Sequence, residues 1–297
     1  MAKKAKATDA AAAKRRRSQA SEVWGRLKKN KGAMVGLFIV TVLVLIAIFA
    51  DVMFDFDTDI AASNLMERLQ KPNAKHWFGT DEMGRDLFAR VVYGTRYSVA
   101  IGAAAVLFSV VIGVPYGAIT GYFGGKVDLF LSRIMDILQS IPATLLGIVI
   151  VSALGQGIGN LVIAIGVAYI AGVASTTRAA VMTVKNSEYV EAARMVGMKE
   201  WQIIAHHIIP NCFSPILVRV TLQVASGIVA ASSLSFLGIG VPVPSPEWGA
   251  LLSAGRGLIR QASYLTIFPG LAIMITVLSL NLLGDGLRDA MDPKLRK

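Results

Sequence analysis

The sequence predicts an all-α integral membrane protein with six transmembrane helices and with both termini on the cytoplasmic side. Three observations lead to this prediction: the composition, the lengths of the uncharged stretches, and the distribution of Lys and Arg. Of the 297 residues, 54% are hydrophobic and only 16% are charged, and the mean hydropathy is +0.58. A soluble domain carries about 25% charged residues, and its helices keep a charged outer face. A soluble helical protein is therefore disfavoured.

The number of spans follows from the stretches that lack Asp, Glu, Lys and Arg. Crossing a bilayer takes about 20 mostly apolar residues in a helix. Five uncharged stretches reach that length: 32–50, 98–125, 137–177, 220–246 and 261–284. The third has room for two helices and contains a glycine-rich turn signal at 155–160. The predicted number of spans is therefore six.

The basic residues orient these spans. Four segments that alternate with the spans hold 22 of the 30 Lys and Arg residues: 1–31, 126–136, 178–219 and 285–297. The two intervening segments, 51–97 and 239–260, hold the other eight. Cytoplasmic loops carry the excess of Lys and Arg, so the four richer segments are predicted to be cytoplasmic. The chain then divides into a tail (1–31), a first span (32–50), an extracytoplasmic segment (51–97) and a core with the other five spans (98–297).

The tail, residues 1–31, is the most basic part of the chain. It contains eleven Lys and Arg residues against two acidic ones, whereas the net charge of the whole chain is +11. Its Ala-, Lys- and Arg-rich composition predicts disorder. Such a basic run could bind nucleic acid, but beside a membrane span attraction to anionic lipid is the simpler expectation. We expect membrane lipid, and no nucleic acid, as its partner.

Three local features are predicted around the second and third spans. A short amphipathic helix is expected at 85–97, ahead of the second span. That span carries Gly113, Gly117 and Gly121 four residues apart, and residues at this spacing share one helix face. Small residues on such a face let a neighbouring backbone approach closely. Pro142 is expected to kink the third span.

Polar residues in the last two predicted spans have two possible roles. Polar groups within a bundle can line a substrate path or form hydrogen bonds between helices. The larger amides need partners wherever they lie. The pathway candidates are Gln223, Ser226 and Asn281.

The chain carries no recognisable chemistry for using energy. The glycine-rich run 121–127 is too short for a phosphate-binding loop and lacks the Ser or Thr that follows its Lys. No predicted span has an ionisable residue at its centre, although ion-coupled carriers usually need one. We therefore expect neither an active site nor a bound cofactor or metal. Any transport would be driven by a partner.

The longest internal cytoplasmic segment, with its core at 178–213, is patterned as two short helices. Asn186 or Ser187 suits the start of the first, and Gly197 suits its end because glycine adopts positive φ freely. The second helix is expected at 199–207, ending before Pro210. It would present Trp201, together with Ile204 and Ile208, as an apolar surface available to another protein.

This segment resembles the EAA loop of ATP-binding-cassette (ABC) importer permeases. The resemblance rests on Glu191-Ala192-Ala193, a glycine four residues later at Gly197, and the Ile209-Pro210 ending. In that family the loop sits in a groove of the ATP-binding subunit and transmits its closure to the membrane helices. The resemblance thus implies a coupling site formed by Glu188, Glu191, Ala192, Ala193, Gly197, Trp201, Ile209 and Pro210.

Two further stretches resemble one branch of that family. Residues 76–87 contain an H-x-x-G-T-D-x-x-G-R-D pattern, and residues 281–293 resemble the ending of the "C" permease of the dipeptide/oligopeptide/nickel group. The outer pattern could be a turn and a helix cap, or also a surface that meets a binding protein. Its residues are Gly79, Thr80, Asp81, Gly84, Arg85 and Asp86.

The resemblance implies a type I importer permease in a bacterial cytoplasmic membrane. Its partners would be a second, similar permease, two ATP-binding subunits that hold ATP and Mg, and an extracytoplasmic solute-binding protein. The expected solutes are dipeptides or oligopeptides, with nickel, glutathione or another small solute as alternatives. A scaffold or an ATP-independent channel is the alternative of another class, although no selectivity segment of a channel is visible.

Overall fold

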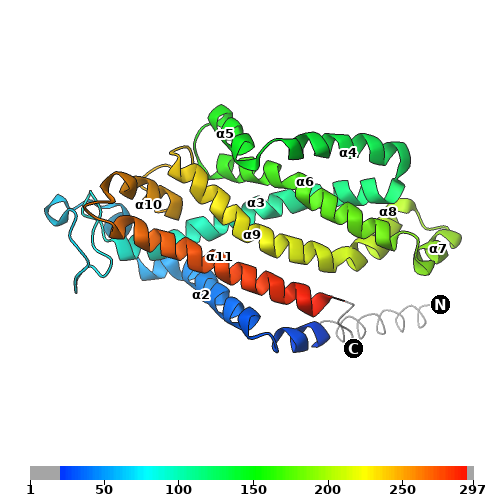
Figure 1. The fold of residues 1–297 in the computed structure, drawn as a ribbon, viewed down its shortest axis with the longest axis horizontal. Coiled ribbons are helices and arrows are strands. Elements are labelled where there is room, and N and C mark those ends of the chain that lie inside the picture. The colour runs from blue at the N-terminus through cyan, green and yellow to red at the C-terminus, as the bar shows by residue number, and fades with distance from the viewer. Residues whose placement is uncertain (1–20, 293–297) are drawn as a thin grey trace.

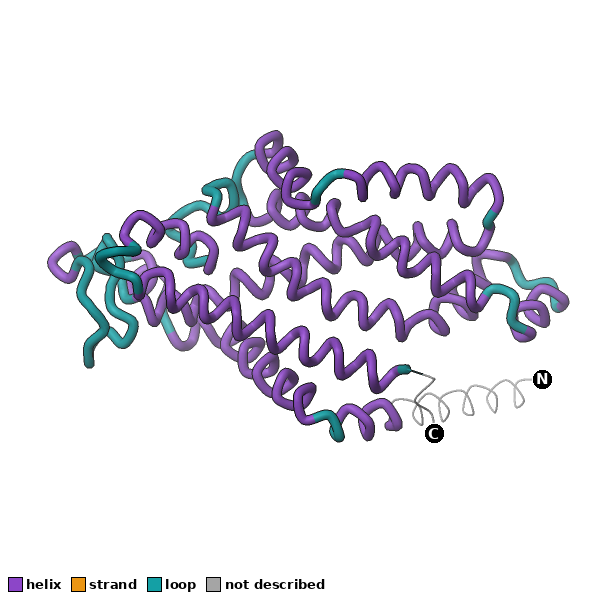
Figure 2. Tube along the Cα trace, viewed as in Figure 1, coloured by secondary structure: helices purple, strands orange, loops and turns teal. Residues whose placement is uncertain are grey.

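The computed structural model describes residues 21–292 and shows an elongated helical bundle (Figure 1). Figure 2 shows helices and loops but no strand within these residues. The single isolated β-bridge among them pairs Thr80 with Asp86. The long helices are α2 (Lys31–Met53), α3 (Leu87–Phe123), α6 (Ile158–Val184), α9 (Phe213–Phe236) and α11 (Tyr264–Met291). The shorter α-helices are α4 (Gly125–Ser140), α5 (Ala143–Leu154), α7 (Glu188–Met195), α8 (Glu200–Ile203) and α10 (Trp248–Gly255).

Five of these helices are long and apolar enough to cross a membrane, and a bent pair completes the predicted six. The pair is α4 and α5, which meet at an angle of 87°. The bend lies at Ile141 and Pro142, where the backbone is extended. Proline lacks an N–H and disfavours helical backbone in the residue before it. The break predicted at Pro142 is therefore present, and it is sharper than a kink.

Residues 126–136, which the sequence predicts to be a cytoplasmic segment, form most of α4, which packs against α3 and α6. Its charged residues hid this helix from an analysis of uncharged stretches. Asp128 accepts two hydrogen bonds from the Arg178 guanidinium of α6, each 2.6 Å long, and a third from Ser132. The charge is thus paired on the helical surface, and no loop is needed to solvate it.

The amphipathic helix expected at 85–97 is wrong as a separate element, because it forms the first turns of α3. Arg90 and Arg96 interrupt the uncharged stretch there, but both are paired by distant residues. Arg90 donates to the carbonyl oxygens of Ile60 and Pro244, at 2.6 and 3.2 Å. Arg96 forms an ion pair with Asp51 at the end of α2.

The α3–α6 contact is very close along one face of α3. A Cβ atom at Gly113 would lie 2.9 Å from the carbonyl oxygen of Ile170, and one at Gly117 would lie 2.2 Å from that of Ala174. At Gly121 the corresponding distance, to the carbonyl oxygen of Arg178, is 2.8 Å. All three contacts are with backbone, which cannot rotate away as a side chain does. Glycine at these positions therefore sets the separation of the two helices.

α2 and α11 run side by side at one flank of the bundle (Figure 1). α2 begins and α11 ends at the end of the bundle that carries α7 (Figure 1), so both described ends share a side, as predicted. Residues 21–27 are helical, and Leu27 packs against Ala33 and Ala290. The prediction of disorder is wrong for these residues because they have apolar partners. Residues 1–20 of the predicted tail lie outside the described residues.

Candidate functional site

The α6–α9 connection, residues 185–212, lies at one end of the bundle (Figure 1). α7 begins after Ser187 and ends at a turn in which Gly197 has a φ of +79°. The Gly197 N–H donates to the carbonyl of Arg194, and the Met198 N–H donates to that of Ala193. A left-handed residue of this kind is a common way to end a helix, and glycine adopts it without strain. The predicted helix, glycine turn and second helix are all present.

The second helix does not stop before Pro210, as the sequence analysis expected. α8 passes into a wider π-helical turn at Ile204–Ile208 and then into a short 3₁₀ turn at Ile209–Cys212, which leads directly into α9. The Ile209 N–H donates to the carbonyl of Ile204, five residues earlier. Pro210 lies at the start of the 3₁₀ turn, where its missing N–H is tolerated. The chain is therefore helical from Glu200 into α9.

One side of the connection is buried against the ends of α3 and α6. The buried side chains form a single apolar cluster: Ala118, Tyr122, Val181, Val190, Ala193, Ile203, Ile208, Cys212 and Ile216. Ile208 was expected to share an exposed face with Trp201, but it is fully buried. The wider π turn changes the angle between successive side chains and places Ile208 in the cluster.

Polar contacts hold the connection to the end of α3. The Tyr122 hydroxyl donates to the Glu200 carboxylate. The Arg194 guanidinium lies 3.9 Å from the Glu200 carboxylate and 5.2 Å from the centre of the Tyr122 ring. The hydrogen bond with Tyr122, followed by the nearby acidic groups, raises the pKa of Arg194 above its ordinary value. Lys185 donates to the carbonyl of Gly121 at 3.0 Å.

The opposite side of the connection is exposed and combines large apolar with charged side chains. Met195, Val196 and Trp201 are 89%, 77% and 61% exposed, and Tyr189 is 42% exposed. Glu188, Glu191 and Ala192 are also exposed, whereas Ala193 is buried. Ile209 is half-buried and Pro210 is exposed. A well-anchored surface with large exposed apolar side chains is typical of a protein interaction site.

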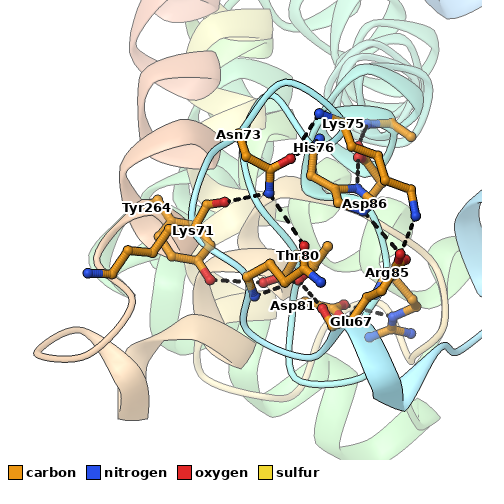
Figure 3. Close-up of polar contacts among 12 residues, drawn as sticks. Glu67, Lys71, Asn73, Lys75, His76, Thr80, Asp81, Arg85, Asp86 and Tyr264 are labelled. Atoms are coloured by element: carbon orange, nitrogen blue, oxygen red, sulfur yellow. Dashed lines mark hydrogen bonds and ion pairs between the residues drawn. The ribbon is translucent and has the colours of Figure 1, made fainter.

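The outer motif lies at the far end of the bundle, where the chain folds back just before α3 (Figures 1 and 3). Thr80 is fully buried. Its hydroxyl accepts from the Gln70 N–H and donates to the carbonyl of Glu67, and its own carbonyl accepts from the Tyr264 hydroxyl. Gly79 and Gly84 have positive φ, and a Cβ at Gly84 would lie 1.8 Å from the carbonyl oxygen of Asn64.

Carboxylates organise the second half of the motif. Asp81 accepts from the backbone N–H groups of Met83 and Arg85 and from Nε of Arg85, at 2.7 to 3.0 Å (Figure 3). Asp86 caps α3 by accepting from the Ala89 N–H at 2.8 Å. Its other oxygen is 2.7 Å from Nδ1 of His76. The helix cap expected from the sequence is present, and the structure adds an ion pair between Asp81 and Arg85.

The comparisons with known proteins decide the family. The family described as "binding-protein-dependent transport system inner membrane component" matches residues 113–297, and the "N-terminal TM domain of oligopeptide transport permease C" matches residues 18–72. The chain is 45% identical over 275 residues to the dipeptide transport system permease protein DppC of Alkalihalophilus pseudofirmus, covering 93% of this chain and 90% of that one.

The chain belongs to the inner membrane permease family of ABC importers. Two other relatives are 40% identical to it. They are the glutathione transport system permease protein GsiD of Pectobacterium atrosepticum, covering 93% of this chain and 91% of that one, and the oligopeptide transport system permease protein OppC of Bacillus subtilis, covering 92% and 88%. An inward-facing structure of the MetNI methionine ABC transporter shares the fold, with a TM-score of 0.57 at 18% identity over 68% of this chain and 97% of that one.

Family membership fixes the general role of the chain. It is a multi-pass inner membrane component of an ABC transporter, and the ATPase of such a transporter resides in separate subunits. Within residues 21–292, no group of three or more His, Cys, Asp or Glu side chains is arranged to hold a metal ion.

The three pathway candidates of this permease lie in different surroundings. Gln223 is buried, and its Nε2 donates to the carbonyl of Tyr169 at 3.4 Å. Its Oε1 has no hydrogen-bond partner among the described residues. Ser226 is exposed, and its hydroxyl donates to the carbonyl of Leu222 at 3.4 Å. Asn281 is half-buried in α11. The three side chains thus differ in burial and in hydrogen bonding.

Two buried charged residues of the permease were not predicted. Arg90 is 2% exposed and lies 3.7 Å from the Asp81 carboxylate, in addition to its two backbone contacts. Glu247 is fully buried, caps α10, and accepts hydrogen bonds from the hydroxyls of Ser98 and Ser232. Both residues fall in expected outer segments, where a charge calls for no explanation. Only a helix-cap pattern at Glu247-Trp248 hints at its position.

Proposed function

We propose that this chain is the C-type permease of an ATP-driven importer of peptides. It would work with a second, similar permease, two ATP-binding subunits and an extracytoplasmic solute-binding protein. Relatives whose names refer to dipeptide, oligopeptide and glutathione transport support this solute class, because all three solutes are peptides with a free carboxylate. The absence of His and Cys from the long apolar stretches argues against nickel as the solute.

The observation that carries the proposal is the exposed surface of the α6–α9 connection. Met195, Val196 and Trp201 form an apolar surface on a segment that is joined to α9 by continuous helix and to α3 by Tyr122 and Glu200. A partner that bound this surface and moved would displace two long helices. ATP would then favour one packing of the bundle through its differential affinity for the two states of the ATPase.

The outer end supplies a surface for the solute-binding protein. Leu65, Met66, Trp77 and Met83 are large apolar residues that are 47% to 94% exposed, on loops held by the Thr80 and Asp81 hydrogen bonds. Rigid loops lose little conformational freedom on binding, so more of the contact energy remains as binding free energy.

The test is peptide uptake by the complete importer in proteoliposomes after substitution in the α6–α9 connection. Glu191→Lys and Gly197→Asp are expected to abolish ATP-driven uptake while the variants still insert into the membrane. Gly155→Asp is the matched control. Gly155 also has positive φ and no neighbour within 4 Å of a Cβ, but it lies between α5 and α6, away from the connection. Glu22→Lys controls for charge reversal at an exposed residue.

Three results would refute the proposal. Uptake that survives both substitutions would remove the coupling role from this segment. Uptake without ATP would indicate a channel. The third result is that Glu191→Lys and Gly197→Asp abolish uptake although the ATP-binding subunits still co-purify as with the wild type. The defect would then not lie in docking.

A further inference from the structure

One face of α9 carries three polar side chains that are exposed or half-buried. Arg219, Ser226 and Ser233 are seven residues apart, so they lie within about 40° of one another around the helix. Arg219 and Ser226 are exposed, and Ser233 is half-buried. By contrast, charged side chains are exposed on α2 only at its ends, at Lys31 and Asp51. Between them its large exposed side chains are apolar: Val35, Phe38, Val42, Val44, Leu45, Ile48 and Phe49. α2 is therefore suited to lipid, whereas this face of α9 is not.

Arg219 lies inside the span and not in the loop to which the sequence analysis assigned it. From the outer end of α9 at Phe236, it is roughly 26 Å along the helix at 1.5 Å per residue. Gly172 of α6, which it contacts, is roughly 21 Å from the outer end of α6 by the same measure. The hydrocarbon core is about 30 Å thick. Both measures place the Arg219 guanidinium in the inner third of the membrane.

The guanidinium of Arg219 rests on the backbone of α6. A Cβ atom at Gly172 would lie 2.5 Å from Nη2 and 3.8 Å from Nε of Arg219, so this seat exists only because residue 172 is glycine. No carboxylate within residues 21–292 forms an ion pair with Arg219. Arg178, on the same helix as Gly172, has its charge matched by Asp128. Arg219 is thus a positioned cation that still has donors to offer.

A cation in this position is costly next to lipid and useful next to a solute. At the centre of a membrane helix a charged side chain costs about 2.5–3.5 kcal/mol, and nearer the inner edge it still needs water or a partner. The open side of α9 therefore faces a water-filled path or another protein. A guanidinium binds a carboxylate through two parallel N–H···O bonds. Peptides carry such a carboxylate at their C-terminus.

We propose that Arg219, seated on Gly172, is the contact that receives the C-terminal carboxylate of the peptide in the inner part of the translocation path. The proposal rests on the proposed function, because it assumes that the solute is a peptide. Ser226 and Ser233 continue the same face toward the outer end and supply hydroxyl groups along it. Arg219 would therefore favour peptides with a free C-terminal carboxylate over C-terminally amidated ones.

The test compares the uptake of a free-acid dipeptide and of its C-terminal amide by the complete importer in proteoliposomes. Each is supplied preloaded on the same solute-binding protein. Any preference of the binding protein cancels when each variant's acid-to-amide ratio is divided by that of the wild type. Arg219→Gln is expected to lower the ratio roughly tenfold, the order of one charge-assisted hydrogen bond. Arg219→Lys should give an intermediate ratio, because it keeps the charge and loses the fork.

Gly172→Ala provides a second variant with the guanidinium intact. Its Cβ would displace Nη2 from the seat, so the ratio should fall without any change of charge. Arg133→Gln is the matched control, because it removes a cation from α4 that is 72% exposed and paired with Asp136. That variant should keep the wild-type ratio.

The outcomes separate the two proposals. A ratio that falls in Arg219→Gln and Gly172→Ala but not in Arg133→Gln supports the carboxylate contact. An equal loss of acid and amide uptake would make Arg219 a structural residue, and unchanged uptake of both would indicate that it merely meets lipid phosphate. Either result refutes this inference while leaving peptide import intact. Wild-type vesicles that import neither peptide would refute the proposed function itself.

Discussion

Replacing Gly117 by alanine tests the close packing that the structure assigns to α3 and α6. The added Cβ would lie 2.2 Å from the carbonyl oxygen of Ala174 and 2.8 Å from Cβ of Thr177. Carbon and oxygen normally approach to about 3.3 Å even in a favourable C–H···O contact. The helices must therefore separate by about 1 Å or bend locally. The obstacle is backbone, so rotating a side chain does not relieve it.

The cost follows from the contacts that are lost when the two helices separate. A gap of about 1 Å forfeits a quarter to a half of the attraction of each atom pair that it opens. The glycine face also includes Gly113 and Gly121, so the loss extends over about two turns. Overpacking of this kind costs about 1–3 kcal/mol, and we expect a value near 2–3 kcal/mol here. In lipid, packing is a main source of helix association, so no hydrophobic gain offsets this loss.

The assay is reversible unfolding of the purified permease in mixed micelles, followed by its helical circular dichroism. Gly270→Ala is the matched control. Gly270 also lies inside a long helix, α11, but nothing is within 4 Å of its Cβ. It should raise the unfolding free energy by about 0.5–1 kcal/mol, the gain of alanine over glycine inside a helix. If Gly117→Ala were as stable as Gly270→Ala, the close approach of α3 and α6 would be wrong.

Two further predictions concern the ends of the bundle. Tyr122→Phe removes the hydrogen bond to Glu200, which is worth about 1 kcal/mol at this partly exposed site. It should raise the number of ATP molecules hydrolysed per peptide imported roughly fivefold. Adding Glu200→Gln to Tyr122→Phe should change this number little, and a further large loss of coupling would contradict the pairing. At the outer end, the hydrogen bond and charge of Lys75 hold the pKa of Glu67 below its ordinary value. The stability that this pair contributes is therefore complete above the ordinary glutamate pKa. It is lost as the pH falls through the lowered pKa of Glu67. The protection factor of the Thr80 amide against hydrogen exchange should therefore fall on acidification in the wild type and change less in Lys75→Gln, because the Thr80 hydroxyl donates to the Glu67 carbonyl. Each rate is first divided by the intrinsic exchange rate at the same pH.

The sequence was sufficient wherever one local property decides the structure. An uncharged stretch of about 20 residues predicts a span because the cost of burying charge is paid residue by residue. Gly197 could be predicted as a helix end because positive φ is a property of a single residue. The α6–α9 connection was recognised from such local features, and its helix, turn and helix are present.

The sequence was insufficient wherever a distant partner satisfies a charge. Asp128 looked like a loop residue until Arg178, fifty residues later, was placed beside it. Arg90 looked like part of an outer segment. It can be buried because the carbonyls of Ile60 and Pro244 accept hydrogen bonds from its guanidinium. Glu247 is buried between hydroxyls of α3 and α9 for the same reason. Periodicity and composition contain no information about such pairings.

The continuity through Pro210 links the inner site to the α6–α9 connection. A helix that ended before Pro210, as expected from the sequence, would have left a flexible joint between the exposed apolar surface and α9. The π and 3₁₀ turns instead keep the chain helical from Glu200 to Phe236. A displacement of the connection is therefore transmitted to α9 and to Arg219. The seat of that guanidinium, Gly172, is on α6, so relative movement of the two helices would change how Arg219 is held. The same movement that opens the path inward would thus alter the proposed grip on the peptide carboxylate.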